Sequence, residues 1–197
     1  MWFKLAFGAA FVSVAYIATS TARRAARTHG GELNQMTSEV PGLLAVRGAL
    51  GLVFYSILMA WLFLPGTLRW TYVPIAPPLQ WLGVVLLVPV IAFFAWSFRS
   101  IGDAYRGGVG LHDAHSLVTT GAYRYVRHPI YIAFIGLMLV VLLISANWLL
   151  GLSGLALVSA IPAARIPIEE RQLHERFGAA WEAYRDRTGR MFPRFRP

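Results

Sequence analysis

The sequence predicts an all-α integral membrane protein with about five transmembrane helices. Of its 197 residues, 57% are hydrophobic and only 14% are charged, and the mean hydropathy is +0.55. Between Val40 and Gly102 there is no acidic residue, and the only basic residues are Arg47, Arg69 and Arg99. Apolar stretches of about 20 residues are long enough to cross the hydrocarbon core as helices. This composition is not that of a soluble domain.

Five apolar segments are predicted to span the membrane within a single domain. They cover residues 2–19, 42–64, 79–98, 129–145 and 148–166. Only Ala146 and Asn147 separate the last two segments, which should therefore form a tight C-terminal helical hairpin. Residues 99–128 are predicted to form a polar loop, and residues 167–197 a polar tail with a helix from about Ile168 to Asp186.

The first span has an alternative interpretation as a cleaved signal peptide. Lys4 would then belong to the charged leader and residues 20–22 to the cleavage site. Arg23, Arg24 and Arg27 follow that site directly and oppose export, so the sequence favours retention of this segment as a membrane span.

Basic residues predict the orientation, because arginine and lysine concentrate in cytoplasmic loops. Most of the arginines fall on one side of the five spans, whereas Lys4 and Arg69 fall on the other. The N-terminus is therefore predicted to lie outside the cell, and the polar loop and the tail on the cytoplasmic side. The net charge of +9 is explained by this bias, so nucleic-acid binding is not expected. Cysteine is absent, which excludes disulfides, thiolate metal sites and a cysteine nucleophile.

The predicted hairpin brings distant polar residues together at its cytoplasmic end. Its two arms are similar in length, so their ends must be neighbours. His128 and Tyr131 should therefore lie near Arg165 and Glu169. The last two are four residues apart and share one helix face, and Pro167 between them removes a backbone hydrogen bond or bends the helix.

Each of these residues also has a purely structural interpretation. His128 would cap a helix, Arg127 would anchor the loop at the membrane surface, and Tyr131 would be an interfacial aromatic residue. Arg165 and Glu169 would form a surface ion pair worth a few tenths of a kcal/mol. Ionisable groups at a membrane boundary are nevertheless functional candidates by default, and their joint occurrence favours a binding site.

The motifs around these residues resemble the isoprenylcysteine carboxyl methyltransferase family, within a wider group of membrane enzymes that includes phospholipid N-methyltransferases. The resemblance rests on the sequences HSLV from His115, GAYRYVRHPIY ending at Tyr131, Glu169-Glu170, and Phe177-Gly178. It covers about residues 99–197. The short chain and its GRMFP ending are most similar to the short prokaryotic members, and the excess of arginine over lysine also favours a prokaryotic source.

The resemblance implies an S-adenosylmethionine-dependent methyltransferase and a set of site residues. The implied cofactor-binding residues are His115, Ser116, Leu117, Val118, Tyr123, His128, Pro129, Ile130, Tyr131, Glu169 and Glu170. Arg165 is implied to bind the substrate, and the catalytic candidates are Arg165, His128 and Tyr131. A further family position, about seven residues before the HSLV stretch, falls near Gly108, where no side chain is available. Methyl transfer from a sulfonium requires no metal, and no metal site is predicted.

The predicted acceptor is the carboxylate of an isoprenylcysteine-like or other lipidic or small apolar molecule, in contact with membrane lipids. Arg165 suits a carboxylate, because its guanidinium can donate paired hydrogen bonds. A phospholipid amine or a small thiol is the alternative acceptor. A nicotinamide-dependent reductase and a non-catalytic lipid-binding relative are the other function classes considered. The sequence predicts no particular oligomeric state.

Overall fold

The computed structural model describes residues 2–28, 41–64, 66–102 and 117–194. Within these ranges the secondary structure is helical, apart from two isolated bridges. The long helices are α1 (Trp2–Thr28), α2 (Pro41–Phe63), α3 (Pro77–Ile101), α4 (Pro129–Ser145), α5 (Trp148–Phe177) and α6 (Ala179–Arg187). Two short 3₁₀ helices are η2 (Arg69–Thr71) and η4 (Gly121–Arg124). The predicted all-α class is confirmed.

Every segment predicted to span the membrane is helical, apart from Leu64 at the end of the second. Four of the described helices contain a stretch long and apolar enough to cross a membrane, namely Trp2–Arg24, Gly42–Phe63, Pro77–Ile101 and Trp148–Phe177. The fifth segment, α4, is a shorter apolar helix of 17 residues. The protein is therefore an all-α integral membrane protein.

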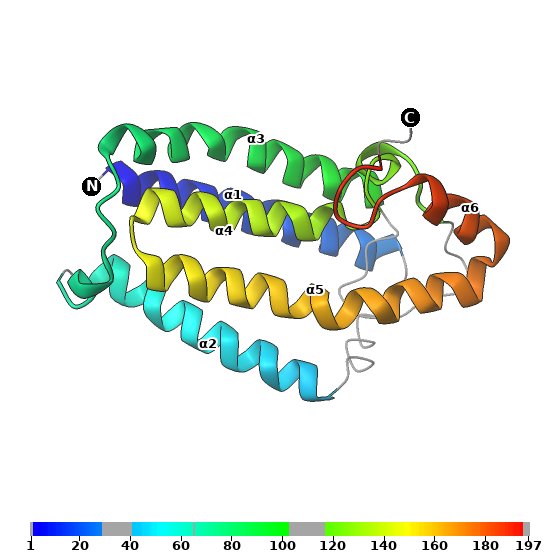
Figure 1. Ribbon diagram of the computed structural model, residues 1–197, viewed down its shortest axis with the longest axis horizontal. Coiled ribbons are helices and arrows are strands. Elements are labelled where there is room, and N and C mark those ends of the chain that lie inside the picture. Colours follow the sequence, from blue (N-terminus) through cyan, green and yellow to red (C-terminus); the bar gives the residue numbers. More distant parts are fainter. Residues whose placement is uncertain (1, 29–40, 65, 103–116, 195–197) are drawn as a thin grey trace.

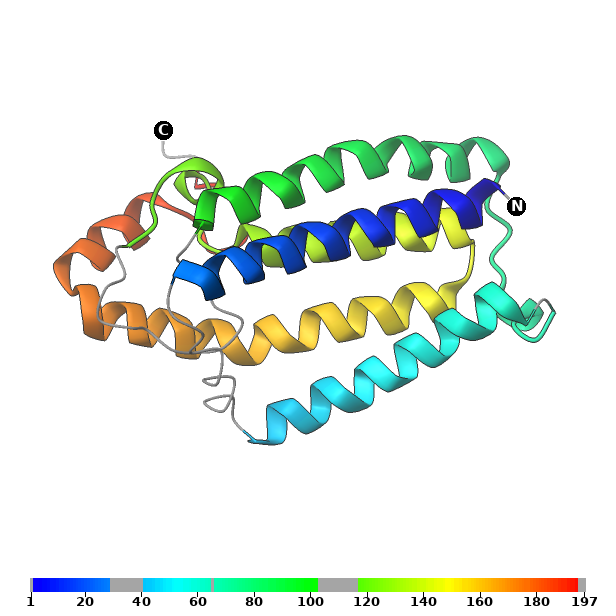
Figure 2. The same cartoon turned by 180° about the vertical axis from the view of Figure 1, so that it is seen from behind.

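The first five helices lie side by side with alternating directions (Figures 1 and 2). Helices α1, α3 and α4 pack together, α5 runs back beside α4, and α2 lies along α5. The C-terminal end of α5 extends past the start of α4, and α6 turns back toward that start. We call this end of the bundle, where α4 begins, the basic end, because Arg23, Arg24, Arg99, Arg124 and Arg127 lie there.

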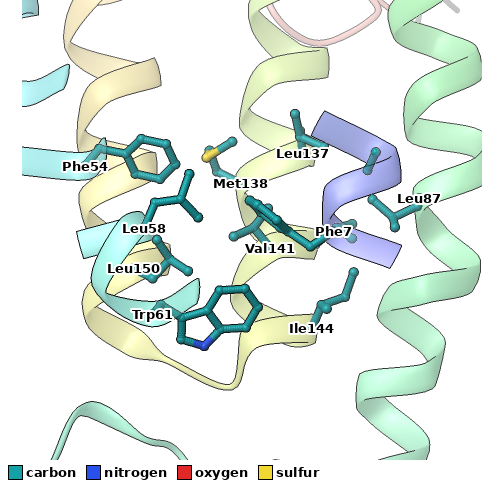
Figure 3. Close-up of a cluster of buried hydrophobic side chains, with 12 residues drawn as sticks. Phe7, Phe54, Leu58, Trp61, Leu87, Leu137, Met138, Val141, Ile144 and Leu150 are labelled. Atoms are coloured by element: carbon teal, nitrogen blue, oxygen red, sulfur yellow. The ribbon is translucent and has the colours of Figure 1, made fainter. Parts of the chain in front are cut away.

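The main hydrophobic core is formed by all five helices from α1 through α5, in the half of the bundle away from the basic end (Figure 3). Its side chains include Phe7 of α1, Phe54, Leu58 and Trp61 of α2, Leu87 of α3, Met138, Val141 and Ile144 of α4, and Leu150 of α5. A smaller cluster of Phe94, Phe98 and Ala133 packs α3 against α4 nearer the basic end. These two clusters fix the positions of α4 and α5, and with them the relative positions of the hairpin's two ends.

The hairpin turn is held by a buried asparagine. Asn147 is fully buried, accepts a hydrogen bond from the Leu150 N–H at 3.0 Å as the N-cap of α5, and donates to Thr71 Oγ1 at 2.6 Å. The Val73 N–H donates to the Ala146 carbonyl at 2.8 Å beside it. The turn between α4 and α5 is thus tied to the connection that precedes α3.

Replacing Asn147 with alanine should lower the free energy of unfolding by about 2 kcal/mol, because a helix cap is lost and a buried hydroxyl loses a partner. Thermal unfolding in detergent measures the change. Ser153→Ala is the matched control, since Ser153 Oγ donates only to the Leu150 carbonyl of its own helix. Equal losses in the two variants would contradict the account of this turn.

The predicted bounds of the tail helix, about Ile168 to Asp186, were wrong. Helix α5 continues through Pro162 and Pro167 to Phe177, and the break comes at Gly178, whose φ is 48°. Proline removes one backbone hydrogen bond, but the helix-forming residues on both sides sustain the helix. Glycine adopts the left-handed conformation at no steric cost and ends helices for that reason.

Candidate active site

The structure confirms the predicted meeting of the two hairpin ends. Tyr131 Oη donates to Glu169 Oε1 at 3.1 Å, and Arg165 Nη2 lies 3.2 Å from the same oxygen. His128 Nδ1 is 3.7 Å from Glu169 Oε2. The His128 and Tyr131 rings are stacked, with centroids 5.9 Å apart and planes 25° from parallel. These four side chains form what we call the site cluster.

Burial and geometry argue against the purely structural interpretations of this cluster. The Arg165 side chain is only 9% exposed, so its ion pair with Glu169 is not a surface pair. His128 occupies the N-cap position of α4, but its side chain makes no capping hydrogen bond and points instead to the acids of α5. The Glu169 carboxylate, at the basic end of an apolar bundle, keeps 24% of its side chain exposed and is open to a polar ligand.

Glu170, the second acid of the pair, has its own set of partners. It accepts hydrogen bonds from Arg127 Nε at 3.0 Å and from Arg190 Nε at 3.2 Å, and it meets His128 Nε2 at 3.3 Å. Arg190 Nη2 also donates to its second oxygen. The Glu170 side chain is 11% exposed. Its carboxylate is therefore surrounded by cations of this chain.

Arg127 is buried rather than exposed at the membrane surface. Beyond Glu170, its Nη1 donates to the Arg185 carbonyl at 3.1 Å and to the Thr188 carbonyl. Its guanidinium lies 5.8 Å from the centre of the Trp181 ring, within the range of a cation–π contact. Arg127 thus ties the loop before α4 to α6 and to the residues after it.

The loop itself is shaped by η4. The Ala122 N–H donates to Ser100 Oγ at 3.1 Å, which attaches η4 to the end of α3. Gly121 has a φ of 61°, and a Cβ there would collide with the Ser100 side chain, so glycine is required on both counts. Tyr123 is buried, and its carbonyl accepts a hydrogen bond from Tyr184 Oη at 2.7 Å.

The remaining predicted cofactor residues fall into two groups. Pro129 begins α4 and Ile130 packs against the Phe94 cluster, whereas Leu117 and Val118 are partly buried at the start of the described loop. His115, Ser116 and the region of Gly108 lie outside the described residues. The cofactor roles of both groups stay predictions.

The tail helix with Trp181 and Tyr184 was predicted to lie at this end of the bundle, but the contacts of Thr188 and Arg190 were not. Trp181, Thr188 and Arg190 all contact Arg127 or Glu170. The GRMFP ending was noticed only as a similarity to short family members, although its first two residues bind the loop backbone. The Arg127 N–H donates to the Gly189 carbonyl at 2.9 Å, and the His128 N–H to the Arg190 carbonyl at 3.2 Å.

Tyr184 provides a test of this packing that depends on pH. Burial raises the pKa of Tyr184 to about 12 from a usual value of 10.0. Above about pH 10 an unfolded tyrosine loses its proton while the folded one keeps it, so the stability from this group is lost as the pH rises toward 12. Tyr184→Phe should cost about 1 kcal/mol at neutral pH, through the lost hydrogen bond. It should also weaken the loss of thermal stability above about pH 10.

The control for this prediction is Tyr125→Phe, because the Tyr125 side chain is exposed. Thermal midpoints of both variants across the alkaline range give the comparison. A pH profile of Tyr184→Phe that is parallel to that of the native protein would contradict the assignment.

The segment that contains the site cluster matches a known protein family. A model of the isoprenylcysteine carboxyl methyltransferase (ICMT) family matches residues 81–175, which include α4, the site cluster and both acids. Over this segment, just under half of its length, the chain is similar to the ICMT family. No curated protein sequence gives a significant match.

A solved structure of the ICMT family shares the fold. The structure of the eukaryotic intramembrane Ras methyltransferase ICMT, without a monobody, superposes with a TM-score of 0.53 at 19% sequence identity. The match covers 79% of this chain but 53% of that chain, so the chain spans about half the length of this relative. At this identity the likeness shows the fold alone. The ICMT family match ends before α6, so the C-terminal residues that contact Arg127 and Glu170 lie outside the matched segment.

Proposed function

We propose that the protein is an S-adenosylmethionine-dependent membrane methyltransferase. We further propose that it methylates the carboxylate of an isoprenylcysteine-like or other lipidic acceptor. The observation that carries the proposal is the site cluster, which lies within the segment matched by the ICMT family. There, buried Arg165 and partly open Glu169 meet, and Glu169 also faces the polar ends of His128 and Tyr131.

The cofactor would be held by groups whose chemistry suits it. S-adenosylmethionine, when bound, would supply a methyl group on a sulfonium and present an ammonium group. Glu169 is oriented by Tyr131 and Arg165 and would accept hydrogen bonds from the ammonium. The Tyr131 ring offers a face that attracts a cation, and the His128 ring stacks beside it. Leu117, Val118, Tyr123, Pro129 and Ile130 would complete the pocket wall, as the resemblance implies.

The acceptor would be positioned by Arg165. Its guanidinium can donate paired hydrogen bonds to a carboxylate while Glu169 neutralises part of its charge. A carboxylate needs no general base to accept a methyl group, so the residues act mainly by holding donor and acceptor in line and excluding water. For a thiol or an amine acceptor, His128 or Tyr131 would assist deprotonation. The lipid tail of the acceptor would remain in the bilayer.

An acceptor panel with methyl-labelled S-adenosylmethionine tests this function. Purified protein in detergent is incubated with a prenylcysteine, a phospholipid amine and a small thiol, and the products are treated with alkali. We expect label mainly in the prenylcysteine product and expect alkali to release it as methanol, because only a methyl ester is cleaved. Label that resists alkali, in the amine or the thiol, would overturn the carboxylate assignment.

Competition between ligands tests the cofactor separately. S-adenosylhomocysteine should displace S-adenosylmethionine from the purified protein, whereas NADPH should not. Displacement by NADPH alone would favour a reductase, and the absence of binding by any of the three would favour a non-catalytic relative.

We also propose that the basic end faces the cytoplasm, following the positive-inside bias. Because the chain has no cysteine, single cysteines report on one position each. Thr67 and Ala183 are both exposed, at opposite ends of the bundle. A membrane-impermeant thiol reagent applied to intact cells should label Thr67→Cys and spare Ala183→Cys until the membrane is permeabilised. The reverse pattern would invert the proposed orientation.

A further inference from the structure

The two adjacent acids of α5 have different surroundings. Glu169 is the more open, with 24% of its side chain exposed against 11% for Glu170. The Glu170 carboxylate is met from two directions, by Arg127 and His128 of the loop before α4 and by Arg190 after α6. Glu170 therefore bridges parts of the chain that are far apart in sequence.

The same parts of the chain are also joined through their main chains. The amides of Arg127 and His128 donate to the carbonyls of Gly189 and Arg190, and Val126 forms a parallel bridge with Gly189. We call residues 188–194 the C-terminal segment. It lies directly against the loop that carries His128.

We propose that Glu170 and Arg190 form a latch, which holds the C-terminal segment against the loop and thereby fixes the His128 ring for the proposed methyl transfer. This inference rests on the proposed function. His128 Nε2 is 3.3 Å from Glu170 Oε1, while Nδ1 faces Glu169 at 3.7 Å. A hydrogen bond at one ring nitrogen sets the orientation and the proton position of the other. Glu170 and Arg190 are then positioning residues that act through His128.

The geometry of the latch favours arginine over other cations. The Arg190 side chain is 54% exposed, and a single ion pair with an exposed partner contributes little. Arg190, however, donates to both carboxylate oxygens of Glu170, through Nε and Nη2. This forked contact is one that lysine cannot reproduce. The hydrogen bond to Glu170 also raises the pKa of the Arg190 guanidinium.

The latch gives Glu170 a different role from the cofactor contact that the family resemblance implies. If Glu170 bound the cofactor directly, its replacement would weaken cofactor binding as the replacement of Glu169 does. If it acts as a latch, its replacement should misplace His128 and lower kcat while cofactor affinity changes little. The two roles therefore predict different kinetic signatures.

The test compares Arg190→Gln and Glu170→Gln with Arg194→Gln, all in the full-length protein. Arg194 is a matched control because it lies in the same segment and donates to the Asp186 carbonyl instead. Amide exchange in residues 124–131 should be about tenfold faster in the two latch variants and unchanged in the control. The ¹⁵N signals of the His128 ring, assigned with a His128→Gln variant, should shift in the same two proteins.

The kinetic outcome separates positioning from simple loss of structure. Both latch variants should lose about tenfold in kcat with KM for S-adenosylmethionine nearly unchanged, and Arg190→Lys should recover part of the loss. The double variant should be little worse than either single one, since coupled residues are not additive.

Three results would overturn the latch. The first is that Arg190→Gln and Arg194→Gln have the same amide exchange rates and the same His128 ring signals. The second is that the kcat losses of the two single latch variants are fully additive in the double variant. The third is a loss of cofactor affinity in Glu170→Gln as large as in Glu169→Gln, with exchange unchanged. If the native protein transfers no methyl group, the proposed function fails. The exchange and ring signals then still support or overturn the latch.

Discussion

Replacing Glu169 with glutamine should raise the Kd for S-adenosylmethionine by about 10- to 100-fold. The substitution keeps the size of the side chain but removes the charge that would pair with the cofactor's ammonium. A hydrogen bond between charged groups is worth about 1.5–3 kcal/mol, and about 1.4 kcal/mol corresponds to tenfold in affinity. Calorimetry with the purified protein in detergent measures this loss directly.

Glu182→Gln is the control for this substitution. Glu182 is also an acid near the basic end, but its side chain is 52% exposed and pairs with His174 on the protein surface. We expect its affinity for S-adenosylmethionine to equal that of the native protein. An unchanged Kd in Glu169→Gln would remove Glu169 from the cofactor site, whereas equal losses in the two variants would indicate a non-specific effect of charge.

Replacing Arg165 with methionine should have a large effect of a different kind. The value of kcat/KM for a carboxylate acceptor should fall by about 100-fold or more, because a buried hydrogen-bonded charge loses its partner. Affinity for S-adenosylmethionine should not weaken. Glu169 keeps its hydrogen bond from Tyr131. Without Arg165, more of the negative charge of Glu169 is free to pair with the cofactor's ammonium.

Arg171→Met controls for the loss of a positive charge on the same helix. Arg171 is exposed, a turn and a half beyond Arg165. We expect both kinetic constants of this variant to stay close to the native values. If Arg165→Met lost cofactor affinity but kept kcat/KM for the acceptor once saturated with cofactor, Arg165 would belong to the cofactor site instead.

The parts of the site predicted from sequence are those that the hairpin dictates. Two apolar arms with a two-residue turn must bring their ends together, so the proximity of His128 and Tyr131 to Glu169 followed from length alone. Helical spacing likewise predicted the contact between Arg165 and Glu169. Such arguments need only local geometry and the alternation of spans.

The contacts that escaped prediction depend on tertiary packing between distant segments. A surface anchor was one interpretation of Arg127, because nothing in its neighbourhood indicates that Thr188 and Arg190 return to meet the same loop. Lys4 lies at the end of the bundle opposite the basic end, and its partners there also escaped prediction. Its Nζ donates to the carbonyls of Trp61 and Leu62 at 2.8 and 2.9 Å, at the C-terminal end of α2.

The most direct test of the central claim is to locate the bound cofactor on the chain. A photoreactive analogue of S-adenosylmethionine is crosslinked to the native protein, and the labelled peptides are mapped by mass spectrometry. We predict label in residues 117–131 or 165–170, prevented by excess S-adenosylhomocysteine and greatly reduced in Glu169→Gln. Label confined to residues 66–76 at the opposite end of the bundle, or label that S-adenosylhomocysteine does not prevent, would contradict a methyl-transfer site at the basic end.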